Sequence, residues 1–303
     1  MPVRIDITKL RVRSLDVDFH ELTWEVARTV EDVLDYKFQV SRSESPEGPF
    51  DLLTEPFEDR YTFIDNIKQV LHRWRQYYYK IVVTHKASGD QKEFGPAANE
   101  PEVDRVALEL RRHIRLLMNE FIGRRCVILP IRTFGQRCPN CWNEILQKRN
   151  KSGCIACYDT GYARGYLHPI EAWISIDPSP KSEQNINTAI THQENTTLRM
   201  GYYPPLKPND LIVEPENIRW RVVQQNQTEH VRSPVHQEVQ VHNINARDIE
   251  YAIPIDFGQA LKNMFFSPPR NQTHPTSFQS FQDEQIPAIF ALYPSSPHPH
   301  GSR

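Results

Sequence analysis

The sequence predicts a mainly β protein with an N-terminal β-sandwich, a linking helix, a zinc-ribbon insertion, a small antiparallel β-barrel and an extended C-terminal arm. Three observations predict this order. Apolar and polar residues alternate with a period of two in two separate regions, as is typical of half-buried strands. Two pairs of cysteines stand between these regions. Proline (24 residues) outnumbers glycine (11 residues), which disfavours long helices and favours short strands and stiff turns.

Residues 1–97 are expected to form the sandwich, because apolar residues keep one parity within each predicted strand. These residues are Leu22, Trp24 and Val26, then Tyr36, Phe38 and Val40, and later Tyr77, Tyr79, Ile81 and Val83. The pattern resembles a fibronectin type III domain, with Trp24 in the second strand and Tyr77 at the place of that family's corner tyrosine. We expect both rings to pack in the core and not to bind a ligand.

Residues 98–125 are expected to contain the linking helix. Over 101–122 apolar residues recur at intervals of three and four, which predicts one buried face. They are Val103, Val106, Ala107, Leu110, Ile114, Leu117 and Phe121. Pro101 fits the first helical turn. Arg111, Arg112 and Arg115 are expected on the other, solvated side.

Residues 126–166 hold the cysteines that carry chemistry. The spacing is C-x2-C, twelve residues, C-x2-C, formed by Cys138, Cys141, Cys154 and Cys157. Two residues between thiolates let one tight turn present both sulfurs to one ion, and four thiolates complete a tetrahedron. The spacing therefore predicts a structural zinc ion, with iron on the same ligands as the alternative. A closed shell leaves no position for water, so we expect no catalysis there.

Basic and aromatic residues surround these cysteines. The basic ones are Arg124, Arg125, Arg132, Arg137, Lys148, Arg149, Lys151 and Arg164, and the rings are Trp142, Tyr158, Tyr162 and Tyr166. Basic groups beside stacking rings can hold a nucleic-acid strand. The favoured interpretation is simpler: the charges keep a small ribbon in solution and the rings form its core. Cys126, in an apolar strand, is expected to be a buried small side chain.

Residues 167–256 return to alternating strands and are expected to form a small antiparallel barrel or sandwich. The predicted strands are Ile170–Ile176, Leu211–Glu214, Ile218–Gln225, Val235–Val241 and Ile249–Ile255. The polar stretch Lys181–Met200 is open to two interpretations, a long hairpin or a loop. Twenty residues of loop without regular structure would be unusual inside a compact domain.

Residues 257–303 are expected to form an extended arm. The segment is rich in proline yet contains Phe265, Phe266, Phe278, Phe281, Phe290 and Tyr293. Disordered tails are usually poor in aromatic residues, whereas rings on a proline-stiffened chain can lie in the grooves of a neighbour. An ordinary floppy terminus is the alternative.

Charge and motifs exclude several function classes. The net charge is −2, so no global electrostatic attraction to nucleic acid or anionic lipid is expected. No apolar run reaches the length of a membrane span, and the charged N-terminus does not read as a signal peptide. The phosphate-binding glycine motifs and the nucleophile-elbow motif do not occur in the sequence. We therefore expect neither a membrane protein nor an enzyme.

The sequence motif that is most specific for a known family lies in the predicted barrel. It reads Leu206-Lys207-Pro208-Asn209-Asp210 before an apolar strand, and Arg219-Trp220-Arg221-Val222-Val223 in the next strand. This resembles the β-barrel of bacteriophage head-completion proteins, the stopper or connector proteins of the neck. That family usually has glycine where Asn209 stands, and asparagine also tolerates the left-handed conformation.

The resemblance implies a structural protein of the virion neck, assembled in the host cytoplasm. Copies of the chain would form a ring between the portal of the head and the tail, and DNA would pass through it without sequence-specific binding. Two alternatives remain open: a baseplate or other tail component, and a zinc-dependent nucleic-acid-binding protein.

Overall fold

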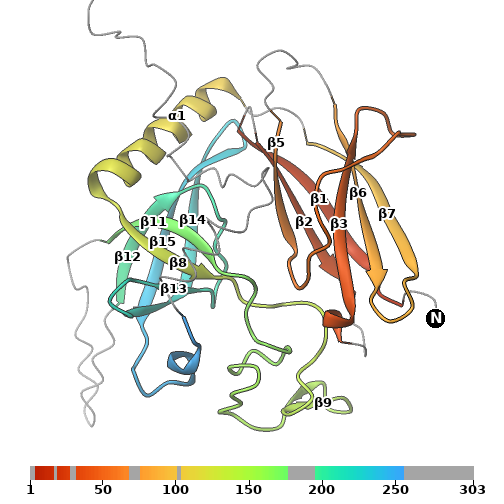
Figure 1. Ribbon diagram of the computed structural model, residues 1–303. Helices are drawn as coiled ribbons and strands as arrows, with labels where there is room; N and C mark the ends of the chain where they lie inside the picture. The colour runs from red at the N-terminus through yellow and green to blue at the C-terminus, as the bar shows by residue number, and fades with distance from the viewer. Residues whose placement is uncertain are drawn as a thin grey trace, which may run out of the picture.

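The computed structural model describes residues 4–16, 19–27, 32–67, 76–100, 104–176 and 195–255. Within these ranges the protein is mainly β, as predicted. The strands form a two-sheet sandwich, a small hairpin and a closed six-stranded barrel (Figure 1). No helix in the described part of the chain has the length and apolar character needed to cross a membrane. The predicted arm, residues 257–303, lies outside the described residues.

The N-terminal sandwich contains two antiparallel sheets, with strand orders β1-β2-β5 and β4-β3-β6-β7. A short 3-10 helix, Val33–Asp35, precedes β3. The strands are β1 (Ile7–Asp16), β2 (Phe19–Val26), β3 (Tyr36–Ser43), β4 (Asp51–Leu52), β5 (Thr62–Asn66), β6 (Tyr78–His85) and β7 (Gln91–Ala98).

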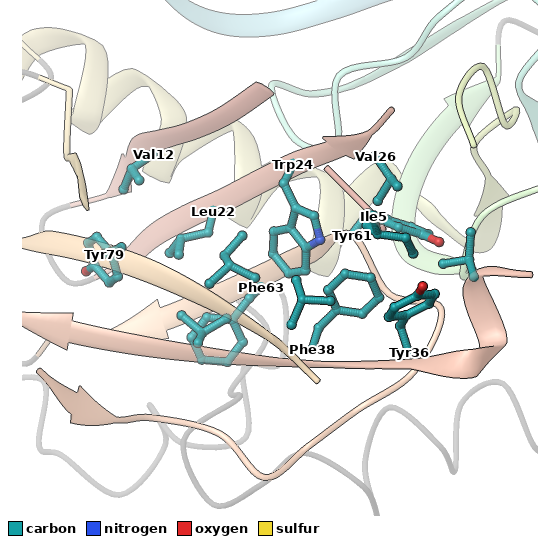
Figure 2. Close-up of a cluster of buried hydrophobic side chains, with 14 of the residues drawn as sticks. Ile5, Val12, Leu22, Trp24, Val26, Tyr36, Phe38, Tyr61, Phe63 and Tyr79 are labelled. Atoms are coloured by element: carbon teal, nitrogen blue, oxygen red, sulfur yellow. The ribbon is translucent and has the colours of Figure 1, made fainter. Parts of the chain in front are cut away.

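Aromatic side chains fill the space between the two sheets. The Trp24 ring lies among Phe38, Phe57 and Tyr61, with ring centroids 6.1 to 6.5 Å away. Figure 2 shows Trp24 pointing from β2 toward Phe38 on the opposite sheet. Trp24 is 2% exposed and Tyr77 is 7% exposed, so the predicted core role of both rings is confirmed.

The linking helix begins later than the predicted residue 101 and ends at Ile122, as predicted, but with a change of helix type. The α-helix α1 spans Arg105–Leu116 and is followed by a π-helical turn, Leu117–Ile122. The Asp104 carboxylate caps the helix by accepting hydrogen bonds from the backbone of Val106 and Ala107. Residues 101–103, which include the predicted first-turn proline and Val103, lie outside the described residues.

The predicted buried face of this helix is wrong for most of its residues. Val106, Leu110, Leu117 and Phe121 are exposed, whereas the buried side chains are Ala107, Leu108, Arg111 and Met118. The reason is that the surface on which the helix packs offers backbone carbonyl groups to an arginine side chain. The Arg111 guanidinium donates to the backbone carbonyls of Leu15 and Pro234, at 2.8 and 2.7 Å. The spacing of apolar residues in the sequence does not reveal that an arginine side chain will be buried in this way.

The barrel closes in the order β11-β12-β15-β14-β13-β8. Its first strand, β8, precedes the cysteines, so the boundaries predicted at 125/126 and 166/167 do not separate the barrel from the cysteine segment. Residues 126–129 are all buried in the barrel, because β8 pairs with β11 on one side and β13 on the other. The strands are β8 (Arg124–Leu129), β11 (Ile170–Ile176), β12 (Asn195–Gly201), β13 (Leu211–Val213), β14 (Arg219–His230) and β15 (Ser233–Asn243).

Two further segments of the predicted barrel differ from the expectation. The segment Ile249–Ile255, predicted as a strand, contains the 3-10 helix Ile249–Ala252, because the closed barrel leaves no free strand edge for it. Of the stretch 181–200, residues 195–200 belong to β12, and residues 181–194 lie outside the described part of the chain.

Candidate metal centre

The four cysteines predicted to bind metal lie together in the segment inserted between β8 and β11. Their sulfur atoms all lie within 4.8 Å of one another, and all four side chains are buried. The Sγ atoms of Cys138 and Cys154 are 3.8 Å apart, and those of Cys141 and Cys157 are 3.4 Å apart. These distances exceed a disulfide bond of about 2.05 Å. They match the ~3.8 Å edge of a tetrahedron with metal–sulfur bonds of about 2.3 Å. The cluster is therefore compatible with a metal site.

The first pair of cysteines is placed by a short hairpin. The backbone NH of Trp142 donates to the Cys138 carbonyl, which closes the turn between the two cysteines. The chain then forms β9 (Trp142–Asn143) and β10 (Lys148–Arg149), which pair antiparallel. The backbone NH of Asn150 donates to the Cys141 carbonyl and returns the chain to the site.

The second pair is held by Asp159, a residue that the sequence analysis missed. Its carboxylate accepts hydrogen bonds from the backbone of Gly153 and Cys154, both at 2.9 Å. Asp159 also has a positive φ of 61°, which lets the chain fold back over the turn. An aspartate two residues after a C-x2-C pair was the available signal, because short carboxylates often cap tight turns.

Arg149 links the two halves of the cysteine segment. It leaves β10 and donates to the backbone carbonyl of Asp159, and its guanidinium lies 3.5 Å from the Asp159 carboxylate. The hairpin of the first pair therefore supports the residue that positions the second pair.

Burial sets the electrostatics of the cluster. It raises the pKa of the Cys141 and Cys157 thiols, because a buried thiolate loses its hydration. A divalent cation offsets this cost, since it stabilises the thiolate over the thiol. Four sulfurs fill a tetrahedral shell, which suits a structural ion and leaves no open position on it.

Most of the surrounding basic residues have partners within the protein. The Arg137 guanidinium lies 3.9 Å from the ring centres of both Trp142 and Tyr162. Arg132 and Arg164 both bind the Asp59 carboxylate of the sandwich, at 2.8 and 2.6 Å.

Near the start of the barrel, Arg124 pairs with Glu214 and Arg125 with Glu171. The rings of Tyr158 and Tyr166 pack against the end of the barrel. The arrangement favours a ribbon with its own small core over a platform for stacking bases.

An open groove of about 1170 Å³ lies between the second cysteine pair and the 3-10 helix Ile249–Ala252. Several of the charged groups that line it have partners: Arg221 binds Glu250, and the Asp248 carboxylate accepts a hydrogen bond from the backbone NH of Asn245. Asp159, also in the groove, is bound as described above. The carboxylates of Asp159, Asp248 and Glu250 thus each hold a local contact.

No protein-family model matches the chain, and no curated protein matches it. The likenesses to fibronectin type III domains and to head-completion proteins therefore rest on the residues quoted above.

Proposed function

We propose that this protein is a structural component of a tailed-bacteriophage virion, without catalytic activity. Copies of it form a ring at the neck, between the portal and the tail, after synthesis in the host cytoplasm. The observation that carries the proposal is the place of the segment resembling head-completion proteins. It forms two consecutive strands, β13 and β14, of the closed barrel.

The turn before β13 supports the same proposal. Asn209 has a φ of +71°, the left-handed conformation expected of the residue that replaces glycine. The Asp210 carboxylate accepts hydrogen bonds from the backbone of Lys207 and Ile131, at 2.6 and 2.7 Å. Because Ile131 begins the cysteine segment, this turn fastens that segment to the barrel.

Zinc is the metal that we propose for the four cysteines. A shell of four thiolates on two short turns is the donor set of structural zinc sites, and binding stabilises a segment with little core of its own. Iron on the same ligands is the alternative. The purified chain should contain one zinc ion by elemental analysis, and Cys154→Ser should lower the content toward zero. Cys126→Ser, a buried thiol outside the cluster, should retain the ion.

The ring is tested by the mass and shape of the purified full-length chain. Native mass spectrometry and negative-stain electron microscopy should show closed rings of one size at micromolar concentration. A monomer that binds oligonucleotides with strong salt dependence would contradict the proposal and favour a nucleic-acid-binding protein. Rings that join tail components but not the portal would favour a baseplate or other tail protein.

A further inference from the structure

Two sulfur–sulfur contacts in the cysteine cluster cross from the first pair to the second. The Sγ atom of Cys138 lies 3.8 Å from that of Cys154, and the Sγ atom of Cys141 lies 3.4 Å from that of Cys157. The sulfurs of each contact need to approach by less than about 2 Å to reach the disulfide length of about 2.05 Å. The arrangement that suits four metal–sulfur bonds therefore also suits two disulfides across the pairs.

The second turn of the cluster lies beside open solvent. Gly153 and Ile155, the neighbours of Cys154 in the sequence, line the groove next to the 3-10 helix Ile249–Ala252. Cys154 is 4% exposed, which is the largest exposed fraction among the four cysteines. The oxidation of a cysteine depends on its thiolate character and on access of the oxidant. An oxidant as small as hydrogen peroxide therefore reaches Cys154 first.

We propose that oxidation by hydrogen peroxide converts the cluster into two disulfides, Cys138–Cys154 and Cys141–Cys157, which hold the cysteine segment together in place of the metal. The inference rests on the proposed function, because the metal keeps the four sulfurs together as thiolates. A virion also carries the chain from the host cytoplasm, where thiols are kept reduced, to an oxidising exterior.

The oxidation proceeds in two balanced steps. The Cys154 thiolate attacks one oxygen of the peroxide, the O–O bond breaks, hydroxide leaves and a sulfenic acid forms. The Cys138 thiolate then attacks the Cys154 sulfur, the S–O bond breaks, a second hydroxide leaves and the disulfide forms. The two sulfurs lose two electrons, which the peroxide gains. A second peroxide oxidises Cys141 and Cys157 in the same way, and the ion dissociates because its thiolate ligands are gone.

The pairing across the two turns determines what the disulfides do. The cysteines of each contact are sixteen positions apart in the sequence. A crosslink that closes such a loop removes more conformational freedom from the unfolded chain than one within a C-x2-C turn. Disulfides across the pairs also tie the β9–β10 hairpin to the second turn, whereas disulfides within the pairs would leave the two halves unconnected. The segment therefore keeps its two halves together after the ion has left.

The test uses the full-length protein, purified with its metal and treated with hydrogen peroxide. The protein is then denatured, its free thiols are alkylated, and it is digested with trypsin without a reductant. Lys148, Arg149 and Lys151 lie between the two cysteine pairs, so trypsin places each pair on its own peptide. The expected product is these two peptides joined, and tandem mass spectrometry should give the proposed pairing. Zinc should appear in solution in step, and the free thiols should fall from five to one per chain.

Two variants accompany the wild type. Cys126→Ser, which changes a buried cysteine outside the cluster, should give the same joined peptides as the wild type. Cys154→Ser, which removes the sulfur that is attacked first, should give no disulfide to Cys138. Removal of the metal by a chelator under reducing conditions should leave all the thiols free, which shows that the disulfides require the oxidant.

Two separate peptides with a disulfide inside each pair, a pairing of Cys138 with Cys157, or thiols that survive the peroxide would each overturn the inference. The zinc content before oxidation tests the proposed metal by itself. Protein that contains zinc but forms none of the expected disulfides would retain the metal and remove this inference. Protein without zinc that still joins Cys138 to Cys154 and Cys141 to Cys157 would support the disulfides and contradict the metal.

Discussion

Single residues outside the cysteine pairs determine whether the sulfurs meet. Asp159 holds two backbone NH groups of the second turn and is itself held by Arg149. Residues behind the ligands of a metal site orient them and tune affinity. The placement of the four sulfurs therefore depends on a carboxylate that is not one of the four candidate ligands.

If the cluster binds zinc as proposed, Asp159→Ala should weaken that binding by about 10- to 100-fold, because the turn that presents Cys154 loses its carboxylate acceptor. Competition with a chromogenic chelator measures the affinity. The affinity of Asp159→Asn, which keeps one acceptor oxygen, should lie between those of the wild type and the alanine variant. Unchanged zinc affinity in the alanine variant would show that the turn holds its shape without the carboxylate.

His20 makes the stability of the sandwich depend on pH. Burial, and secondarily the Arg42 charge, lowers the pKa of His20 to about 4 from 6.5. Its Nδ1 atom lies 3.0 Å from the Tyr79 hydroxyl, which donates to Asp65. Between pH 6.5 and pH 4 the unfolded chain binds a proton at this residue that the folded chain does not.

The contribution of a neutral His20 should therefore be complete above pH 6.5 and be lost as the pH falls to 4. The difference amounts to about 3 kcal/mol of unfolding free energy. Urea unfolding at pH 7 and pH 4.5 measures it, and His20→Gln should show a smaller loss than wild type. His113→Gln, an exposed histidine on α1, should follow the wild-type profile. Equal profiles for all three proteins would contradict the assignment.

At the scale of elements, the long β14–β15 hairpin has an unusual turn. His230 pairs with Ser233, so Val231 and Arg232 alone form the loop, and their φ angles are +48° and +61°. Two-residue hairpin loops with positive φ angles strongly favour Asn-Gly, and a β-branched valine is strained there. Backbone strain at Val231 should therefore lower the unfolding free energy of the chain.

Replacing the pair by Val231→Asn and Arg232→Gly should stabilise the protein by about 1–2 kcal/mol, since both residues then tolerate the left-handed conformation. Thermal unfolding should show a midpoint higher by about 2 °C for a chain of this size. Val223→Asn, at an exposed position within β14, should give no such gain. A lower midpoint in the double variant would mean that the turn is not strained.

At the scale of the whole molecule, buried polar contacts join the parts. Arg111, 6% exposed, bridges Leu15 of the sandwich and Pro234 of the barrel. Its guanidinium also lies 4.1 Å from the centre of the Tyr202 ring, whose hydroxyl donates to the Leu15 carbonyl. Asp59 of the sandwich binds Arg132 and Arg164 of the cysteine segment. Since Asp210 of the barrel accepts a hydrogen bond from the backbone of Ile131, the cysteine segment is held to both the sandwich and the barrel.

Arg111→Met should lower the unfolding free energy by about 2–4 kcal/mol, because two buried carbonyls lose their charged donor. Guanidinium unfolding, followed by tryptophan fluorescence and circular dichroism, measures the change. Arg112→Met, which removes an exposed pair with Glu109, should cost less than about 1 kcal/mol. Equal effects of the two substitutions would contradict a joining role for Arg111.

The sequence by itself determined the strands of the sandwich and the cysteine cluster. Alternation at Leu22, Trp24 and Val26 is a local signal, and a C-x2-C turn brings two sulfurs together without any distant partner. The meeting of the two pairs was also predictable from their spacing, because two C-x2-C pairs are the ligand pattern of a single four-cysteine metal site.

Only the tertiary structure decided which distant segments meet. β8 precedes the cysteines in the sequence and closes the barrel by pairing with β11 and β13. The sequence of a strand does not show which distant strand it will pair with. An aspartate after the second pair is a candidate turn cap, but only the fold shows that its carboxylate reaches the backbone NH groups of Gly153 and Cys154. The buried face of α1 was decided by Arg111, because two carbonyls from separate domains satisfy its charge. Val106, Leu110 and Phe121 of that helix are exposed as a consequence, because the side that carries Arg111 packs on the barrel.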